Sequence, residues 1–127
     1  MRGFGSKIKQ ASFREDGLSM AHGAGDEVIV WDFSGTGPSG KKPQILGPFE
    51  TEVVEVHYQN EGNILCSAGK DGILLFWDPL ETQQPVAISG IRDQEVASFA
   101  WAPDDSFLVV GFVPGYVTFI PWVKPSV

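Results

Sequence analysis

Short apolar runs separated by turn residues recur along this chain, and their spacing predicts strands rather than helices. In one run, Val54, Val56 and Tyr58 alternate with Glu55 and His57. Such alternation places the apolar residues on one face of an extended strand and the polar residues on the other. Other runs are apolar almost throughout, which is typical of strands covered on both faces. No segment shows a helical period, so we expect an all-β protein.

The same order of segments occurs three times. Each copy has a first strand, a tight polar turn, a second strand, a Gly-containing turn and a third strand. An aromatic residue precedes the polar turn of each copy, with spacings of 45 and 43 residues: Phe13, Tyr58 and Trp101. The third strands of the first two copies end in Trp-Asp pairs whose tryptophans are 46 residues apart: Trp31-Asp32 and Trp77-Asp78. A fixed period of this size predicts an array of small sheets.

The strands expected in each copy follow from these anchors. Second strands are predicted at residues 18–21, 64–68 and 107–110, each ended by a glycine: Gly23, Gly69 and Gly111. Third strands are predicted at residues 28–31, 73–77 and 116–120. Fourth strands are predicted only in the first two copies, near residues 44–46 and 85–89. By spacing, Ile120 takes the position of Trp77 in the third copy.

Composition narrows the class of protein. Hydrophobic residues make up 43% of the 127 residues, which favours a folded domain over a disordered one. The net charge of -7 opposes binding to nucleic acid or to an anionic membrane surface, and favours a basic or uncharged protein partner. No apolar run approaches the length of a membrane span, and residues 1–6 lack a secretory signal. The single cysteine, Cys66, fits a reducing compartment, so we expect a cytoplasmic protein.

The three copies resemble the WD-repeat β-propeller family. The resemblance covers roughly residues 6–122 and is clearest in the second copy, which contains Ser67-Ala68-Gly69-Lys70-Asp71-Gly72 and Phe76-Trp77-Asp78. It implies a structural hydrogen-bond network in which Ser67, Asp71 and Trp77 take part, with Trp31, Asp32 and Asp78 as further structural residues. The histidine of that network is absent, because Gly47-Pro48 stands where the family has Gly-His.

The resemblance implies three blades: blade one at residues 6–47, blade two at 48–90 and an incomplete blade three at 91–127, which lacks its outer strand. Three blades are too few to close a ring. The chain is therefore expected to be the C-terminal part of a larger propeller, a self-associating arc such as two times three blades, or an open arc. Exposed edges make the open arc the least favoured state.

Catalytic chemistry is not indicated. Ser67, His57 and Asp71 could be read as a triad, but the family resemblance assigns serine and aspartate a structural role. His22, His57 and Cys66 lack the spacing of metal ligands. We expect no catalytic residues, no metal and no cofactor.

The expected function is non-catalytic protein–protein interaction, with the alternative that the chain is an inactive module of a larger regulator or enzyme. The resemblance places the contact surface on the loops that lead into the first and third strands. The partner-binding residues predicted there are Phe49, Glu50, Glu52, Lys70, Arg92, Asp93 and Phe112. Aromatic and arginine residues are enriched at the centres of protein interfaces. Alternatively, Phe49 and Phe112 pack between blades.

Overall fold

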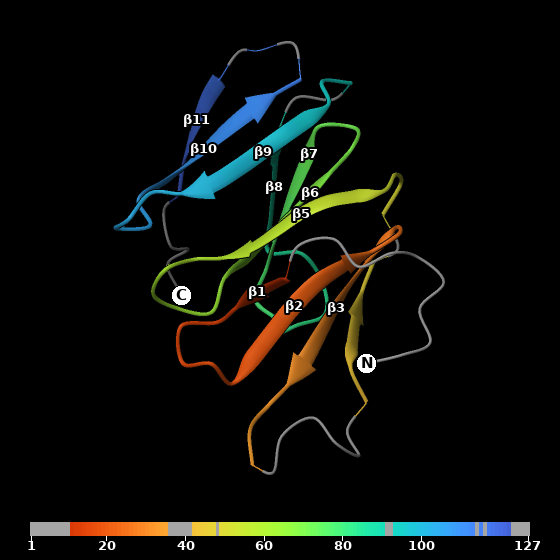
Figure 1. The fold of residues 1–127 in the computed structure, drawn as a ribbon, viewed down its shortest axis with the longest axis vertical. Helices are drawn as coiled ribbons and strands as arrows, with labels where there is room; N and C mark the ends of the chain where they lie inside the picture. The colour runs from red at the N-terminus through yellow and green to blue at the C-terminus, as the bar shows by residue number, and fades with distance from the viewer. Residues whose placement is uncertain are drawn as a thin grey trace.

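Three antiparallel sheets follow one another along the chain, as the repeats predict (Figure 1). The computed structural model describes residues 11–35, 42–47, 49–90, 93–113, 115 and 117–122. Within these residues every regular element is a strand. The all-β fold class of two four-stranded sheets and one three-stranded sheet is confirmed.

Each sheet is a meander in which consecutive strands pair. The first sheet contains β1 (Ala11–Phe13), β2 (Ser19–Ala24), β3 (Glu27–Asp32) and β4 (Gln44–Leu46). The second contains β5 (Val53–Tyr58), β6 (Leu65–Gly69), β7 (Ile73–Trp77) and β8 (Ala87–Gly90). The third contains β9 (Val96–Trp101), β10 (Phe107–Phe112) and β11 (Val117–Pro121).

The strand registers establish which positions are equivalent. Met20 pairs with Trp31, Leu65 with Trp77 and Leu108 with Ile120. The two strand-ending tryptophans therefore occupy the same position in their sheets. Ile120 occupies that position in the third sheet, as its spacing predicts.

Among the described residues, two layers of buried apolar side chains lie between neighbouring sheets. The layer between the first and second sheets contains Ala21, Val28, Val30, Leu46, Val53, Val56, Tyr58, Leu65 and Trp77. The layer between the second and third contains Cys66, Ala68, Leu74, Phe76, Val96, Phe99, Trp101, Leu108, Val110 and Phe112. The second sheet contributes to both layers, which explains why β6 is buried along its whole length. Flank-to-flank burial of apolar side chains thus stabilises the array.

Hydrogen bonds between sheets supplement this packing. The Tyr58 hydroxyl lies 2.8 Å from the Ser19 hydroxyl, and the Tyr58 amide donates to Ser12 Oγ at 2.9 Å. The indole of Trp101 donates to the carbonyl of His57 at 3.1 Å. The aromatic residues that precede the polar turns of the second and third copies therefore tie each sheet to the one before it.

A bulge in β5 places Val54 on a different face of the strand from the predicted one. The register shifts between Val53 and Glu55, so Val54 does not continue the alternation that begins at Val56. Val56 packs toward the first sheet, whereas Val54 packs against the layer shared with the third sheet. The prediction that Val54 shares a face with Val56 and Tyr58 is wrong for this reason.

Two of the three glycines predicted to end second strands lie inside them. Gly23 is within β2 and Gly111 within β10, and only Gly69 ends its strand. A Cβ atom on Gly23 would meet Val53 Cγ1 at 3.1 Å, which is tighter than most van der Waals contacts. Gly23 thus allows β2 to continue past a side chain of the second sheet, a close approach that the sequence pattern does not reveal.

Candidate functional site

The strand-ending tryptophans are held by polar partners on the neighbouring strand. Trp77 Nε1 donates to Ser67 Oγ at 2.9 Å, and both side chains are buried. Trp31 Nε1 donates to His22 Nε2 at the same distance. The predicted contact between Ser67 and Trp77 is present, but the role of His22 is not foreseen from the sequence. The repeat spacing could have indicated this role, because His22 lies 45 residues before Ser67 and Phe13 lies 45 residues before Tyr58.

Asp71 stabilises the β6–β7 turn, in which it lies. Its Oδ1 accepts from the Ile73 amide at 3.1 Å, and its amide donates to Thr51 Oγ1 at 3.2 Å. Thr51 therefore supplies a side-chain contact from the loop that precedes β5, close to where the family pattern would have a histidine. No motif in the sequence indicates this role for Thr51.

The two aspartates that follow the tryptophans differ in environment. Asp32 Oδ1 accepts from the amide and hydroxyl of Ser34 at 2.8 and 2.6 Å, which stabilises the turn after β3. The backbone carbonyl of Asp78 accepts from the amides of Glu81 and Thr82. Its Oδ1 is buried without a hydrogen-bond partner among the residues that the structure describes.

In the third sheet the tryptophan and its polar partner are both replaced by apolar residues. Ile120 stands at the Trp77 position and Val110 at the Ser67 position. Replacing both members of a hydrogen-bonded pair leaves no polar group without a partner, so the exchange carries little penalty.

Glu55 is a buried carboxylate at the junction of the second and third sheets. One of its oxygens accepts from the Phe99 amide at 2.7 Å, and the other lies 3.3 Å from the Ser98 hydroxyl and 3.5 Å from His57 Nε2. Burial raises the pKa of Glu55, but the hydrogen bonds from His57, Phe99 and Ser98 outweigh it and hold this pKa below its ordinary value. From the sequence, Glu55 is predicted only to lie on the polar face of an alternating strand.

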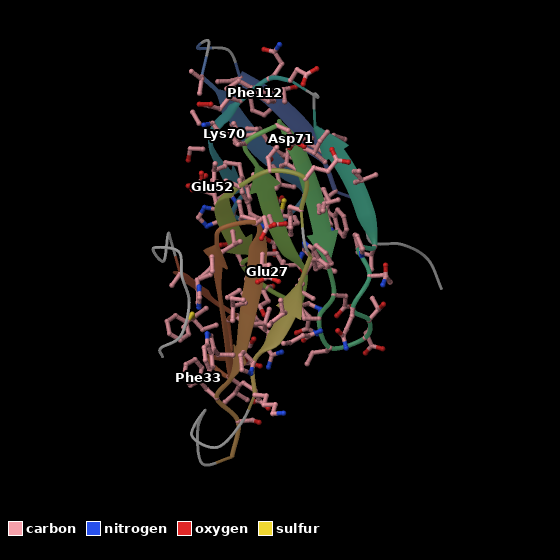
Figure 2. All side chains as sticks on the ribbon, turned by 90° about the vertical axis from the view of Figure 1, so that its right-hand side faces the viewer. Glu27, Phe33, Glu52, Lys70, Asp71 and Phe112 are labelled. Atoms are coloured by element: carbon pink, nitrogen blue, oxygen red, sulfur yellow. The ribbon has the colours of Figure 1, made fainter. Side chains whose placement is uncertain are left out.

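The loops predicted to contact partners converge on one side of the array. The turns β2–β3, β4–β5 and β6–β7 lie on the right-hand side of Figure 1. Figure 2 views the molecule from that side and shows Glu52, Lys70 and Asp71 in the same part of the structure. Backbone hydrogen bonds join these loops: the Lys70 amide donates to the Glu52 carbonyl at 2.8 Å, and the Asp93 amide donates to the Asp71 carbonyl at 2.7 Å. We call this side the loop face.

The predicted partner-binding residues differ in their positions. The charged residues Glu50, Glu52, Lys70 and Asp93 are exposed on the loop face. Arg92 lies outside the described residues.

The two aromatic residues of this prediction are not exposed loop residues. Phe112 ends β10 and is only 2% exposed, so the expectation of an exposed aromatic at this position is wrong. Its side chain belongs to the core layer between the second and third sheets, because β10 continues past Gly111. Phe49 is half-buried, with its ring centroid 5.8 Å from that of Trp77. For both residues the structure has the alternative arrangement, packing between blades.

The loop face is acidic. The acidic residues of its described turns are Asp26, Glu27, Glu50, Glu52, Asp71, Asp93 and Glu95, of which Figure 2 labels Glu27, Glu52 and Asp71. Lys70 is the single basic residue among these described turns. The surface therefore favours positively charged or neutral partners over anionic ones.

A cavity of about 470 Å³ opens on the opposite face, between the first and second sheets. Its lining includes Arg14, Trp31, Lys42, Tyr58 and Leu80, none of which was predicted to bind a partner. Burial raises the pKa of Tyr58, whose hydroxyl bonds with Ser19 at the cavity. Charges of both signs and apolar side chains share this lining, so it defines no single ligand chemistry.

The described residues contain no group of three or more His, Cys, Asp or Glu side chains that could hold a metal ion. Over the same part of the chain, no helix is long and apolar enough to cross a membrane.

Comparison with known proteins agrees with this geometry. No family model matches the chain. The periodic tryptophan protein 2 homolog of Schizosaccharomyces pombe is 28% identical over 95 residues, which cover 73% of this chain and 10% of that protein. The β-propeller domain of Cps50 (Swd1) from Myceliophteria thermophila superimposes with a TM-score of 0.77 at 17% identity, over 98% of this chain and 36% of that one.

The three sheets and the structural match show the fold of part of a β-propeller. The distant similarity to periodic tryptophan protein 2 and the structural match to the Swd1 propeller agree with the resemblance of the repeats to those of WD-repeat propellers. The chain spans about a tenth of the curated relative and about a third of the matched structure.

Proposed function

We propose that this chain is a non-catalytic protein-interaction scaffold that contacts its partner through the loop face. WD-repeat propellers are typically interaction scaffolds, which is the general expectation for this fold. One observation supports the more specific proposal: loops from all three sheets are joined by backbone hydrogen bonds, and acidic residues outnumber basic ones among their described residues. A rigid sheet array beneath such loops lowers the entropy lost when a partner binds.

The favoured partner is a basic segment of another protein. Lys and Arg side chains on the partner would pair with carboxylates such as Glu50 and Glu52, and the excess of acidic groups would repel anionic surfaces. Exposed charges of this kind raise the association rate and the specificity more than they raise affinity. We therefore expect moderate, salt-sensitive binding.

A lysine-rich peptide labelled with a fluorophore is the probe that tests this surface. Anisotropy titrations would compare the unchanged chain with the double variant Glu50→Gln, Glu52→Gln. Removing two exposed charges is expected to weaken binding by roughly two- to tenfold at low salt. Added salt should reduce the difference between the two proteins.

The matched control removes the same charge from the opposite face. Glu61 lies in the β5–β6 turn and Glu81 in the β7–β8 loop, and both are exposed. The double variant Glu61→Gln, Glu81→Gln should bind the peptide as the unchanged chain does. Equal weakening by both double variants would show attraction to net charge alone and would refute the loop face as the binding surface.

A second candidate function is that of a non-catalytic module within a larger regulatory protein or enzyme. The small share of both matched proteins that this chain spans favours this candidate. Sequencing the transcript tests it: an open reading frame that continues into further WD repeats would support the module, and a stop codon after Val127 with a start at Met1 would count against it.

A further inference from the structure

The two junctions between neighbouring sheets differ in the size of their side chains. The strand registers, continued for two residues beyond the third strands, show which positions of the two junctions are equivalent. At three such positions the junction of the first and second sheets has the smaller side chain: Val30 in place of Phe76, Tyr58 in place of Trp101 and Pro79 in place of Trp122. All three smaller residues line the cavity of about 470 Å³.

At the junction of the second and third sheets the larger rings fill the equivalent space. Phe76 stacks on Trp122 with ring centroids 4.8 Å apart, and Trp101 meets these two rings edge to face at 6.1 and 5.9 Å. The cavity therefore exists because ring atoms present at one junction are absent at the other. Both of its walls are sheets of this chain, and its volume is within the range of small-ligand sites, about 300 to 1,000 Å³.

The cavity offers apolar surface to a ligand. Its apolar and aromatic lining residues are Leu18, Val30, Trp31, Tyr58, Pro79 and Leu80. Leu18 and Leu80 are 44% and 62% exposed, although both are large apolar side chains. An apolar group bound here would remove part of this surface from water, which favours binding.

Arg14 supplies a cation with unused hydrogen-bond donors. Its side chain is only 10% exposed, and its Nε donates to the two carboxylate oxygens of Asp16 at 3.0 and 3.1 Å. Within the part of the chain that the structure describes, no hydrogen bond involves its two Nη atoms. Burial raises the pKa of Tyr58, and the bond with Ser19 and the positive charge of Arg14 oppose that rise. The guanidinium thus lies near the Tyr58 hydroxyl at the cavity.

The acidic groups of this region are already engaged or lie outside the cavity. Asp32 is the single acidic residue among the described residues of the lining, and it accepts from the amide and hydroxyl of Ser34. Asp16 is bonded to the guanidinium, and Asp78 is not among those lining residues. Lys42 adds a second cation to the lining. The composition of the lining alone defines no ligand, but the hydrogen bonds leave cationic donors available, which favours an anionic group.

We propose that this cavity binds an organic carboxylate, with its apolar part against the aromatic and aliphatic walls and its carboxylate on the Nη atoms of Arg14. A guanidinium can pair with a carboxylate through two parallel hydrogen bonds. A free organic acid has this chemistry, and so does an acidic side chain next to an apolar one in a partner protein. The site is on the face opposite the loop face and is separate from the function proposed above.

Isothermal titration calorimetry of the whole chain tests the proposal with two pairs of probes. Hydrocinnamate is compared with hydrocinnamamide, and the blocked dipeptide acetyl-Asp-Phe amide with acetyl-Asn-Phe amide. Each pair keeps the ring and removes the charge. The acid should bind roughly tenfold more tightly than its amide, because charge-assisted hydrogen bonds are the stronger ones. Tighter binding of hydrocinnamate would assign the site to a free acid, and tighter binding of the dipeptide would assign it to a partner protein.

Two variants test the two parts of the site. Arg14→Gln should remove the preference for the acid over the amide, and it leaves the 43% exposed Asp16 side chain to water. Pro79→Trp introduces the residue that the third copy has at this position, so it should fill the cavity and weaken both members of each pair by roughly tenfold or more. Lys70→Gln removes the same charge as Arg14→Gln from the loop face and should bind as the unchanged chain does. Melting curves would show that each variant is folded.

Four results would overturn the proposal. They are the absence of heat from either acid at millimolar concentration, equal binding of acid and amide, a preference for the acid that Arg14→Gln retains, and an equal loss of that preference in Lys70→Gln. Unchanged binding by Pro79→Trp would also overturn it, since the ligand would then lie elsewhere. The loop-face test uses a lysine-rich peptide and its own variants, so failure of one proposal is distinguishable from failure of the other.

Discussion

Glu55 provides a sharp test of how the second and third sheets are joined. Its carboxylate is buried and accepts a 2.7 Å hydrogen bond from the Phe99 amide, which is itself buried in β9. A hydrogen bond to a charged acceptor contributes about 1.5 to 3 kcal/mol, against about 1 kcal/mol for a neutral one. We expect Glu55→Gln, which keeps one carbonyl oxygen, to lower the free energy of unfolding by about 1 kcal/mol.

The variant Glu55→Ala should be more damaging. It removes every acceptor and leaves the Phe99 amide without its partner, so the expected loss is about 2 to 4 kcal/mol. In a domain of this size each kcal/mol corresponds to a change in Tm of about 3 to 5 °C. Urea unfolding followed by tryptophan fluorescence would measure both variants. Glu81→Gln, at an exposed position, is the control and should change little.

The pH dependence of the stability difference between the unchanged chain and Glu55→Gln distinguishes the effect of the Glu55 charge from that of side-chain shape. The pKa of Glu55 is lower in the folded chain than its ordinary value of 4.5. As pH falls, the unfolded chain therefore takes up this proton first, and stability contributed by the carboxylate is lost from about pH 4.5 downward through the folded-state pKa. The difference between the unchanged chain and Glu55→Gln should be full at pH 7 and shrink in this acidic range. A difference that is absent at pH 7, or that stays constant with pH, would refute the reasoning.

Three further outcomes are expected. Trp77→Phe keeps a ring in the core but loses the indole bond to Ser67, and should lower the free energy of unfolding by about 1 to 2 kcal/mol in urea titrations. Asp105→Ala removes the carboxylate that accepts from the Asn60 amide at 2.7 Å, so hydrogen exchange at that amide should accelerate, and an unchanged rate would contradict this role. Burial raises the pKa of the Cys66 thiol well above its ordinary value, so a thiol reagent at pH 8 should label it only when the chain unfolds.

Much of the fold follows from local patterns. The polar turns after Phe13, Tyr58 and Trp101 and the two Trp-Asp pairs set the period, and residues 44–46 and 73–77 form strands with the predicted bounds. These strands could be predicted because a strand next to a tight turn is determined largely by its own residues. The other strands begin or end one to three residues from the prediction, since pairing with neighbours decides where a strand stops.

The site was less predictable because its residues act between paired strands and between sheets. His22 holds Trp31 only because the first sheet places the two on paired strands, and Glu55 reaches Phe99 only because the third sheet packs beside the second. The bulge at Val54 reverses which layer that residue joins. Phe112 looked like a loop residue because it follows a glycine, yet β10 extends through it into the core.

The sequence by itself therefore determined the repeat, the strand order within each sheet and the equivalence of Trp31, Trp77 and Ile120. These depend on period and on turn chemistry, which are local properties. Only the tertiary structure decided which polar groups pair across sheets and which loops share the acidic loop face. Those properties depend on how separate sheets pack, and one residue of register shift in a strand is enough to move a side chain from one face to the other.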